Sequence, residues 1–281
     1  MILDTIARSA GKRVEQRKQV KSLEQMMKAA CECREREGIK GDAIKRAGIK
    51  RENGTNEVHP FKAALSKPGV SFICEVKKAS PSKGLIAPDF PYVEIARQYQ
   101  EAGADAVSVL TEPEFFLGAD RYLEEIHREI ELPLLRKDFI VDEYQIYEAK
   151  VLGASAVLLI CSIMDMEKLK RYMGICGSLG LSSLAEAHTD REVAMAAEAG
   201  ADIIGINNRN LETFEVDFTN ALRLRKLVDR GTIFVAESGI RTPEDIELLA
   251  ENQVDAVLVG ETLMRAPDKK RALRELKSRI G

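Results

Sequence analysis

The sequence has little of what metal sites and disulfide scaffolds require. It has no tryptophan, three histidines and five cysteines. Cys31 and Cys33 have no second cysteine pair near them, and His59, His127 and His188 lie far apart. These spacings do not match a zinc site, so we expect no metal. The odd number of scattered cysteines predicts reduced thiols in a cytoplasmic protein.

Long apolar runs are also missing. The longest nearly apolar run, 154–163, is much shorter than the roughly 20 residues that a membrane helix needs. The first residues include an acid, Asp4, and lack the apolar centre of a secretory signal. Apolar residues make up 45% of the chain and charged residues 31%, enough for a large core and a charged surface. We expect a cytoplasmic protein without a membrane partner.

Aromatic residues are absent from a basic N-terminal segment. Residues 1–51 hold 14 Lys and Arg against 7 Asp and Glu, a net charge of +7, whereas the rest of the chain carries −10. A basic arm is typical of nucleic-acid-binding proteins. Here acids such as Glu15 and Glu24 alternate with the bases, and no ring is present to stack on a nucleobase. We favour a solvated amphipathic helix and no nucleic-acid partner.

From Val70 onward, short apolar runs alternate with amphipathic helical segments. The predicted strands are 70–77, 104–110, 132–137, 155–160, 181–186, 201–207, 231–237 and 255–260. Helical patterns follow them, for example over 92–102, 142–152, 191–199 and 243–251. Strict alternation indicates parallel strands, and strands that are apolar on both faces indicate covering helices. Eight units predict an α/β fold, a single (β/α)8 TIM barrel.

An internal repeat supports the barrel. Four versions of a Gly-Ala-Asp-Ala-type unit place Asp105, Ser155, Asp202 and Asp255 in equivalent positions, 50, 47 and 53 residues apart. Each version joins a helix end to the start of a strand, so the repeat marks every second strand of eight. The alternative is an open doubly wound sheet, but no Gly-x-Gly-x-x-Gly follows the first strand.

The repeat also divides the chain. Residues 1–65 lie outside it and are predicted as an N-terminal helical extension packed on the barrel, and 66–281 as the catalytic barrel. Within the extension we expect a break at Asn53-Gly54-Thr55 and a short helix beginning at Pro60.

Charged residues collect where alternate predicted strands end. Glu75 and Lys77 end the first strand, Lys137 the third, Glu186 the fifth and Glu237 the seventh. Functional residues of such barrels lie at these strand ends. The alternative is a structural ring of salt bridges, but clustered charges in a cleft are more often functional. Because side chains alternate along a strand, positions 75 and 77 point the same way.

The loops after the seventh and eighth strands predict a phosphate site. Ser238-Gly239 permits close backbone approach, Thr242-Pro243 is a good helix start, and Gly260 precedes another helical turn. Backbone N–H groups and the helix dipole favour a dianion at such places. The alternative is an ordinary tight turn.

Several long motifs resemble one known family. They include Glu75-Val-Lys-Lys-Ala-Ser-Pro-Ser-Lys-Gly84, Leu135-Arg-Lys-Asp-Phe-Ile-Val-Asp142, Ile206-Asn-Asn-Arg-Asn-Leu211 and Val235-Ala-Glu-Ser-Gly-Ile240. The chain resembles indole-3-glycerol phosphate synthase over essentially its whole length and in the same order. The resemblance implies a cofactor-free carboxy-lyase of tryptophan biosynthesis. It would convert 1-(2-carboxyphenylamino)-1-deoxyribulose 5-phosphate into indole-3-glycerol phosphate, carbon dioxide and water.

The resemblance also implies catalytic roles. Lys137 corresponds to the general acid of ring closure and Glu186 to the base of dehydration, and neighbours are expected to draw their pKa values toward neutrality. Lys77 matches a second catalytic lysine near the substrate carboxylate. Which lysine donates in which step stays open.

Further matches supply positioning and binding residues. Glu75 would hold Lys77 and the substrate. Asn207 and Glu237 would orient ring closure. The apolar positions around the anthranilate ring are Phe116, Phe139 and Leu158. The phosphate and loop-closing positions are Ser80, Arg209, Ser238, Gly239 and Gly260, and the loop after the first strand is expected to act as a lid.

Two departures from the family pattern stand out. Glu261 replaces a small hydroxyl residue that some members carry beside the phosphate, so its side chain is expected to turn away. Ser155 replaces an aspartate at the start of a strand, where activity should not depend on it.

Other functions remain as alternatives. A sugar-phosphate isomerase, such as phosphoribosylanthranilate isomerase, needs a thiol or carboxylate base at the end of the first strand. Cys74 should face the opposite side from Glu75, which argues against this function. A non-catalytic phosphate-binding or partner-binding barrel should lack Lys137 or Glu186, yet both are present. A further alternative is that the basic N-terminal segment is a docking arm for another enzyme of the tryptophan pathway.

Overall fold

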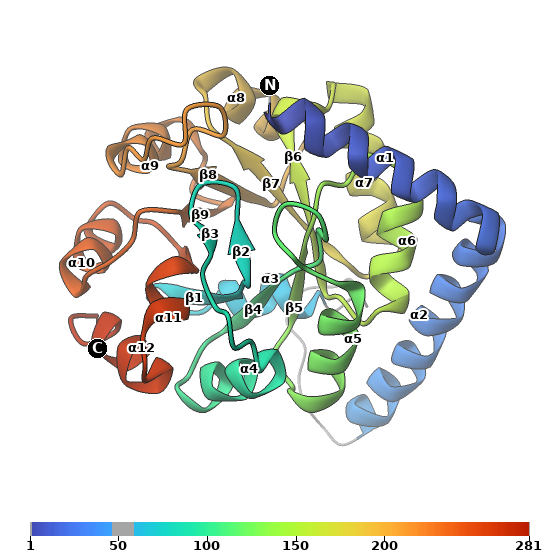
Figure 1. Cartoon of the computed structure of the whole chain (residues 1–281), viewed down its shortest axis with the longest axis horizontal. Helices are drawn as coiled ribbons and strands as arrows, with labels where there is room; N and C mark the ends of the chain where they lie inside the picture. The colour runs from blue at the N-terminus through green and yellow to red at the C-terminus, as the bar shows by residue number, and fades with distance from the viewer. Residues whose placement is uncertain (1, 47–58, 281) are drawn as a thin grey trace.

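The computed structural model describes residues 2–46 and 59–280 (Figure 1). In this part of the chain eight parallel strands close into a barrel, which confirms the predicted strands and excludes the doubly wound sheet. In barrel order they are β1 (Ser71–Val76), β4 (Ala106–Leu110), β5 (Leu134–Lys137), β6 (Ala156–Ile160), β7 (Ser182–Ala187), β8 (Ile203–Asn207), β9 (Ile233–Glu237) and β10 (Ala256–Val259). Ile73 of β1 pairs with both Ala106 and Leu258, which closes the ring.

Helices surround the barrel, as Figure 1 shows. They are α4 (Tyr92–Glu101), α5 (Asp120–Glu129), α6 (Tyr144–Val151), α7 (Met166–Ser178), α8 (Asp190–Glu198), α9 (Thr219–Leu224), α10 (Pro243–Glu251), α11 (Glu261–Arg265) and α12 (Lys269–Leu276), with 3-10 turns η1 (Cys161–Ile163) and η2 (Arg225–Leu227). The bounds of α10 match the sequence prediction. The Thr242 side chain accepts a hydrogen bond from the Asp245 N–H, and Pro243 fixes the first turn.

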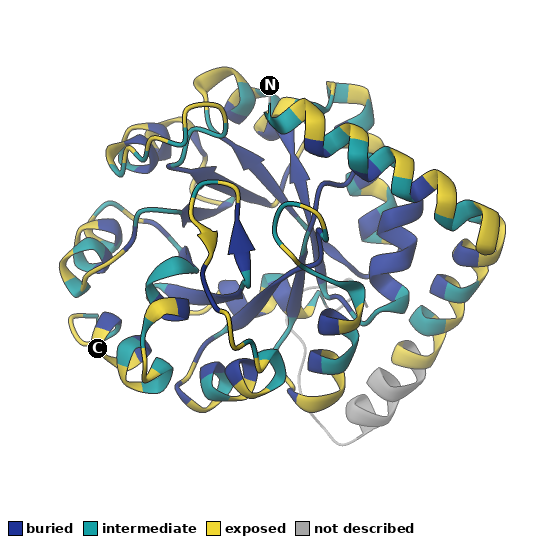
Figure 2. Ribbon diagram, viewed as in Figure 1, coloured by how far each residue is buried: buried dark blue, intermediate teal, exposed yellow. Residues whose placement is uncertain are grey.

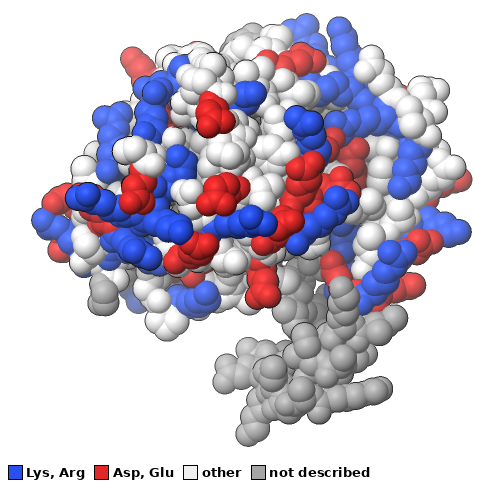
Figure 3. All heavy atoms as spheres, turned by 60° about the horizontal axis from the view of Figure 1, so that its bottom comes forward, with Lys and Arg blue, Asp and Glu red and all other residues white. Residues whose placement is uncertain are grey.

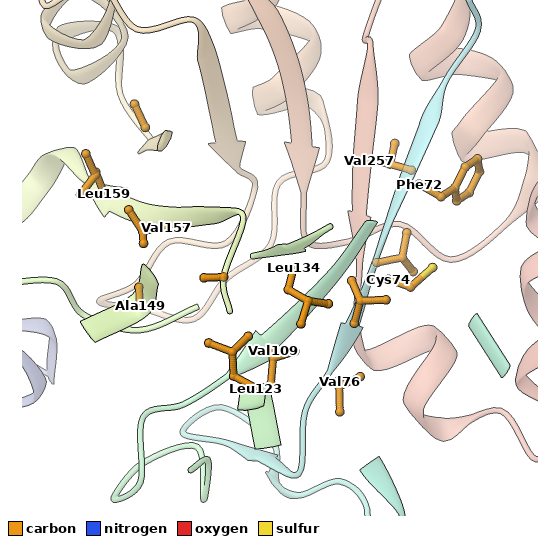
Figure 4. Packing of buried hydrophobic residues seen from close by; sticks show 14 of the residues in the cluster. Phe72, Cys74, Val76, Val109, Leu123, Leu134, Ala149, Val157, Leu159 and Val257 are labelled. Atoms are coloured by element: carbon orange, nitrogen blue, oxygen red, sulfur yellow. The ribbon is translucent and has the colours of Figure 1, made fainter. Parts of the chain in front are cut away.

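The hydrophobic core has two layers that follow the alternation of side chains along each strand. Ile73, Leu135 and Leu184 point into the barrel, whereas Phe72 and Cys74 pack between the strands and the helices. Figure 4 shows Phe72 and Cys74 within this outer layer, and Figure 2 shows buried strands inside helices whose outer faces are exposed. Both layers fix the strands in place, so their carboxyl ends meet at one mouth.

Two of the repeated aspartates stabilise the opposite end of the barrel. Asp105 Oδ2 accepts a hydrogen bond from the Phe72 N–H at 2.9 Å, and Asp255 Oδ2 accepts one from the Phe234 N–H at 2.8 Å. Each aspartate therefore satisfies the N–H of the second residue of a neighbouring strand. Ser155 lies at the equivalent position, where its N–H donates to Leu134 O at 2.8 Å.

The N-terminal residues form α1 (Ile2–Val20), α2 (Leu23–Arg46) and α3 (Pro60–Leu65). In Figure 1, α1 crosses one edge of the barrel and α2 runs beside α6. The helix expected at Pro60 is confirmed, whereas the break expected at Asn53-Gly54-Thr55 lies outside the described residues. The division at residue 65 into extension and catalytic barrel stays a prediction.

Basic residues along α1, among them Arg13 and Lys18, are paired with acids of the barrel. Arg13 contacts Glu112 at 3.1 Å, and Lys18 contacts Asp142 at 2.8 Å. Ile6 lies two helical turns before Arg13, so it is buried on the same side of α1 against the barrel. These contacts agree with an amphipathic helix packed on the barrel. On the face in Figure 3, Lys and Arg side chains are interleaved with Asp and Glu side chains. No helix in the described residues is long and apolar enough to cross a bilayer.

Candidate active site

A cavity of about 450 Å³ opens at the carboxyl ends of the barrel strands. Its volume is typical of a small-molecule site. All the residues that the sequence assigned to catalysis and substrate binding line it: Glu75, Lys77, Ser80, Phe116, Lys137, Phe139, Leu158, Glu186, Asn207, Arg209, Glu237, Ser238, Gly239 and Gly260.

Lys137, the last residue of β5, lies at the centre of the charged groups. Its Nζ donates to Glu186 Oε2 of β7 at 3.0 Å and lies 3.4 Å from Glu237 Oε2 of β9. The carboxylate side chains are only 4% and 2% exposed. Residues from alternate strands form one layer inside such a barrel, which explains why β5, β7 and β9 bring these groups together.

The environment raises the pKa of two of these groups. The higher pKa favours the charged form of Lys137 but the neutral form of Glu237. Burial lowers the pKa of Lys137, but the negative charges of Glu186, Glu237 and Glu75 outweigh burial and raise it above its ordinary value. The expected shift of Lys137 toward neutrality is therefore wrong for the ligand-free site. Burial raises the pKa of Glu237 to about 8, although the charge of Lys137 opposes this shift. Glu237 Oε1 is buried and has no hydrogen-bond partner among the described residues.

A second pair, Glu75 and Lys77, lies beside this group. Lys77 Nζ donates to Glu75 Oε1, which confirms that positions 75 and 77 share one face of the chain. A Cβ at Gly260 would lie 2.2 Å from Glu75 Oε1 and 3.0 Å from Lys77 Nζ. Gly260 therefore makes room for this pair in addition to its predicted place near the phosphate.

Gly205 has a similar role that the sequence reasoning missed. A Cβ there would lie 2.2 Å from Glu237 Oε1. A glycine inside a predicted buried strand is the signal that could have identified it, because such a glycine often marks a close approach of another group.

One wall of the cavity is apolar. The rings of Phe116 and Phe139 have centroids 6.1 Å apart, and Leu158 of β6 lies on the same lining. Ile2 and Leu3 of α1 complete this wall, a contribution that the sequence reasoning missed.

The opposite end of the cavity has a sharply turned backbone. Ser238 and Gly239 have φ values of 67° and 82°, in the left-handed region. A Cβ at Gly239 would lie 2.7 Å from Val216 Cγ1, so both the backbone conformation and the available space favour glycine. Consecutive residues of this kind can present backbone N–H groups to an anion.

The start of α10 is less available for an anion than its sequence indicated. Asp245 Oδ2 accepts hydrogen bonds from the N–H groups of Arg241 and Thr242, at 2.8 and 2.9 Å. Thr242 in turn accepts from the Asp245 N–H. This capping box already uses three amides of the helix start. An anion would therefore depend on the turn at Ser238 and on the residues after Gly260.

The prediction that Glu261 turns away from the site is wrong. Its side chain lines the cavity, with Oε1 3.5 Å from Lys83 Nζ and Oε2 4.0 Å from Arg209 Nη2. Lys83 lies in the hairpin of β2 (Ala79–Ser80) and β3 (Gly84–Leu85), which stands over the mouth in Figure 1. Two cations at the cavity wall therefore attract the carboxylate inward.

The comparison with known families agrees with the site. The model of the family "Indole-3-glycerol phosphate synthase" matches residues 3–276. The chain belongs to the indole-3-glycerol phosphate synthase family. This is a family of carboxy-lyases of tryptophan biosynthesis.

Individual relatives extend over the same length. The chain is 50% identical to indole-3-glycerol phosphate synthase of Lachnoclostridium phytofermentans over 278 residues, 99% of each chain. It is 58% identical to that of Endomicrobium trichonymphae over 217 residues, 77% of this chain and 84% of the relative. The solved 3-hexulose-6-phosphate synthase from Salmonella typhimurium covers 74% of this chain and 97% of its own, with a TM-score of 0.61. At 15% identity, this likeness supports the fold alone.

The chain also contains a buried arginine that the sequence reasoning did not single out. Arg136 is fully buried beside Lys137, and its Nη2 contacts Asp120 and Glu148, both at 2.9 Å. Arg17 of α1 contacts Asp120 at 2.6 Å. A charged residue at an outward position of an apolar strand was the available signal, because buried arginines need acidic partners.

The described cysteine and histidine residues do not line the cavity. Cys74 packs in the outer layer of the core, on the opposite side of β1 from Glu75, and burial raises the pKa of its thiol. This position disfavours the isomerase alternative. His188 Nδ1 lies 2.7 Å from Asn207 O, a structural contact. The described residues contain no group of three His, Cys, Asp or Glu that could hold a metal.

Proposed function

We propose that this chain carries out the indole-3-glycerol phosphate synthase reaction with Lys137 and Glu186 as its proton donor and acceptor. The observation that carries the proposal is the 3.0 Å contact between Lys137 Nζ and Glu186 Oε2 inside a buried cavity. One side of this pair is an apolar wall that suits an aromatic ring, and the other side is a turn that suits a phosphate.

Ring closure is the first step. The ring carbon that bears the carboxylate attacks the ketone carbon, and negative charge develops on the ketone oxygen. Lys137 would donate a proton to this oxygen. Its raised pKa keeps the ammonium charged near neutral pH, so a donor is present when the oxygen becomes basic. The carboxylate then leaves as carbon dioxide, and the pair of electrons returns to the ring.

Dehydration is the second chemical step. The hydroxyl group formed from the ketone leaves as water, and a base removes the proton that the intermediate must lose to become an indole. Glu186 would be this base. It is buried at the same cavity and hydrogen-bonded to the lysine, so one pair of side chains can serve both steps.

The remaining groups would bind and orient the substrate. Lys77, held by Glu75, would face the substrate carboxylate, because an ammonium stabilises a carboxylate that must be removed from water. Asn207 and Glu237 would orient the ketone. Asn207 Oδ1 is itself fixed by the Arg209 N–H at 3.0 Å. A protonated Glu237 could donate a hydrogen bond through its unpaired oxygen.

The two ends of the cavity would hold the two ends of the substrate. Phe116, Phe139 and Leu158 would enclose the anthranilate ring, and this low-dielectric wall favours loss of the carboxylate as neutral carbon dioxide. The backbone turn at Ser238 and Gly239, with Arg209 and Ser80, would hold the phosphate. The hairpin of β2 and β3 would act as the lid.

Location and partners follow from the proposed reaction. The chain would work in the cytoplasm on a small sugar phosphate, and its five cysteines are free thiols, as expected there. Contact with other tryptophan-pathway enzymes stays a prediction.

The direct test is formation of indole-3-glycerol phosphate from the carboxyphenylamino substrate, followed by the absorbance or fluorescence of the indole. We expect turnover without added metal or organic cofactor, and the same rate after treatment with a chelator. Absence of product under these conditions would refute the proposed reaction. Inactivation by the chelator would refute the metal-free mechanism.

A further inference from the structure

The side chain of Glu261 lies at the end of the cavity where the proposed function places the phosphate. It follows Gly260 directly and begins α11. Three cations surround it. Arg265 Nε lies 3.1 Å away, within hydrogen-bond distance, whereas Lys83 Nζ and Arg209 Nη2 lie 3.5 and 4.0 Å away. All three cations also line the cavity.

The three contacts differ in how easily they can be given up. Arg265 is four residues from Glu261 on the same helix, so this pair can persist whatever binds in the cavity. Lys83 belongs to the β2–β3 hairpin, and Arg209 to the loop after β8. Their distances of 3.5 and 4.0 Å are charge contacts beyond good hydrogen-bond length. A stronger anion can therefore replace the carboxylate at these two cations.

The charge of the carboxylate persists at neutral pH. Partial burial raises the pKa of Glu261, but the hydrogen bond from Arg265 and the charge of Lys83 outweigh burial, and the pKa lies below its ordinary value. A phosphate dianion at this end of the cavity would thus meet a fixed negative charge as well as the two cations. Like charges at close range cost binding free energy.

We propose that Glu261 is an exchangeable counter-ion that sets the phosphate affinity of this site. In the empty enzyme its carboxylate balances Lys83 and Arg209 and holds the hairpin at the mouth. When the substrate phosphate binds, these two cations transfer to the phosphate and Glu261 keeps Arg265. Glu261 thereby weakens phosphate binding and eases release of the product. This inference rests on the proposed phosphate end of the cavity.

The first test measures the affinity of the purified full-length enzyme for inorganic phosphate by isothermal titration calorimetry. Glu261→Gln removes the charge and preserves the shape. We expect it to bind phosphate up to about fivefold more tightly than the wild type, the upper end of the range for one partly exposed charge contact. Glu261→Thr should act in the same direction. Unchanged or weaker phosphate binding in both variants would overturn the inference.

Glu129→Gln is the matched control. Glu129 pairs with Arg97 at the exposed end of α5, so this variant has the same change of net charge away from the cavity. Its phosphate affinity should equal that of the wild type. Equal tightening in this control would mean that net charge alone is responsible, and would also overturn the inference.

The second test asks whether Glu261 acts through Lys83. In a double-mutant cycle, the tightening caused by Glu261→Gln should be smaller when Lys83→Gln is present. Hydrogen exchange of residues 81–85 should be faster in Glu261→Gln than in the wild type without phosphate, and equal when phosphate is saturating. Additive effects together with unchanged exchange would contradict an action through Lys83.

These readouts separate the inference from the proposed reaction. If the wild type forms the indole product but Glu261→Gln leaves phosphate affinity unchanged, the inference fails and the reaction stands. If Glu261→Gln tightens phosphate binding but no indole product forms, the counter-ion role stands and the proposed reaction fails.

Discussion

The two ends of the barrel both carry acidic side chains, but these acids have different kinds of partner. At the amino ends of the strands, Asp105 and Asp255 accept hydrogen bonds from the N–H groups of Phe72 in β1 and Phe234 in β9. These N–H groups belong to the backbone and cannot change their protonation state. The aspartates therefore have a fixed structural role.

At the carboxyl ends the acids face titratable side chains across a cavity. Glu186 and Glu237 both contact Lys137, and one oxygen of Glu237 is left without a partner in the described part of the chain. Buried groups with spare hydrogen-bonding capacity can bind a ligand or move a proton. The comparison teaches that the partner of an acid, more than its burial, decides whether the acid stabilises the fold or takes part in the reaction.

The largest expected effect comes from removing the ammonium at the mouth. Lys137→Ala should lower kcat by about 10³-fold or more, because the developing oxyanion loses its proton donor. Steady-state kinetics with the carboxyphenylamino substrate measure this effect. Lys170→Ala, an exposed position on α7, is the control and should keep normal turnover. Near-normal kcat in Lys137→Ala would refute the assigned role.

Removing the charge of the facing carboxylate should have the next largest effect. Glu186→Gln should lower kcat by about 10²-fold, the lower part of the range for loss of a general base. The amide keeps the size of the side chain, so KM should change little. A large rise in KM with unchanged kcat would instead make Glu186 a substrate-binding group.

The pH dependence of stability tests the unpaired carboxyl. The pKa of Glu237 rises from 4.5 to about 8 on folding, so between these pH values the folded state binds more protons than the unfolded state. The contribution of Glu237 to the free energy of unfolding should therefore fall as pH rises from 4.5 to about 8. Urea unfolding of the wild type and Glu237→Gln across this range measures it. Parallel curves would contradict the raised pKa.

At the opposite end of the barrel the expected effect is on stability alone. Asp255→Ala leaves the buried N–H of Phe234 without its partner and should cost about 1–3 kcal/mol of unfolding free energy. The value of kcat should not change. Asp229→Ala, at an exposed position, controls for loss of a carboxylate. A large loss of kcat in folded Asp255→Ala would break the distinction between the two ends.

The smallest effect is expected at the one repeat position without an acid. Ser155→Asp would place a carboxylate near the N–H of Leu134 in β5, as Asp105 does for Phe72 in β1, and should add about 0.5–1 kcal/mol of stability. Chemical denaturation beside Ser155→Ala measures the gain, and kcat should stay within error of the wild type. A loss of stability would mean that an aspartate at this repeat position does not form the hydrogen bond.

The sequence predicted the features that depend on local signals or on strand direction. The bounds of α10 follow from Thr242 and Pro243, which start the helix. Lys137 and Glu186 meet because parallel strands that alternate with helices must end at one mouth. These inferences need no knowledge of how distant side chains pack.

Other features depend on contacts between segments far apart in the chain. The direction of Glu261 is set by Lys83 and Arg209, which come from two different loops. The pKa of Lys137 is raised because three carboxylates from three strands outweigh its burial. The contribution of Ile2 to the cavity depends on how α1 crosses the barrel. No local pattern in the sequence encodes these outcomes.

The assignment of Lys137 to ring closure and Glu186 to dehydration is tested most directly by the release of carbon dioxide from carboxyl-labelled substrate in a single turnover. Glu186→Gln should release close to one equivalent of labelled carbon dioxide while forming little indole, because ring closure precedes the step that it blocks. Lys137→Ala should release almost none. Release from Lys137→Ala together with no release from Glu186→Gln would contradict the roles assigned to the two side chains.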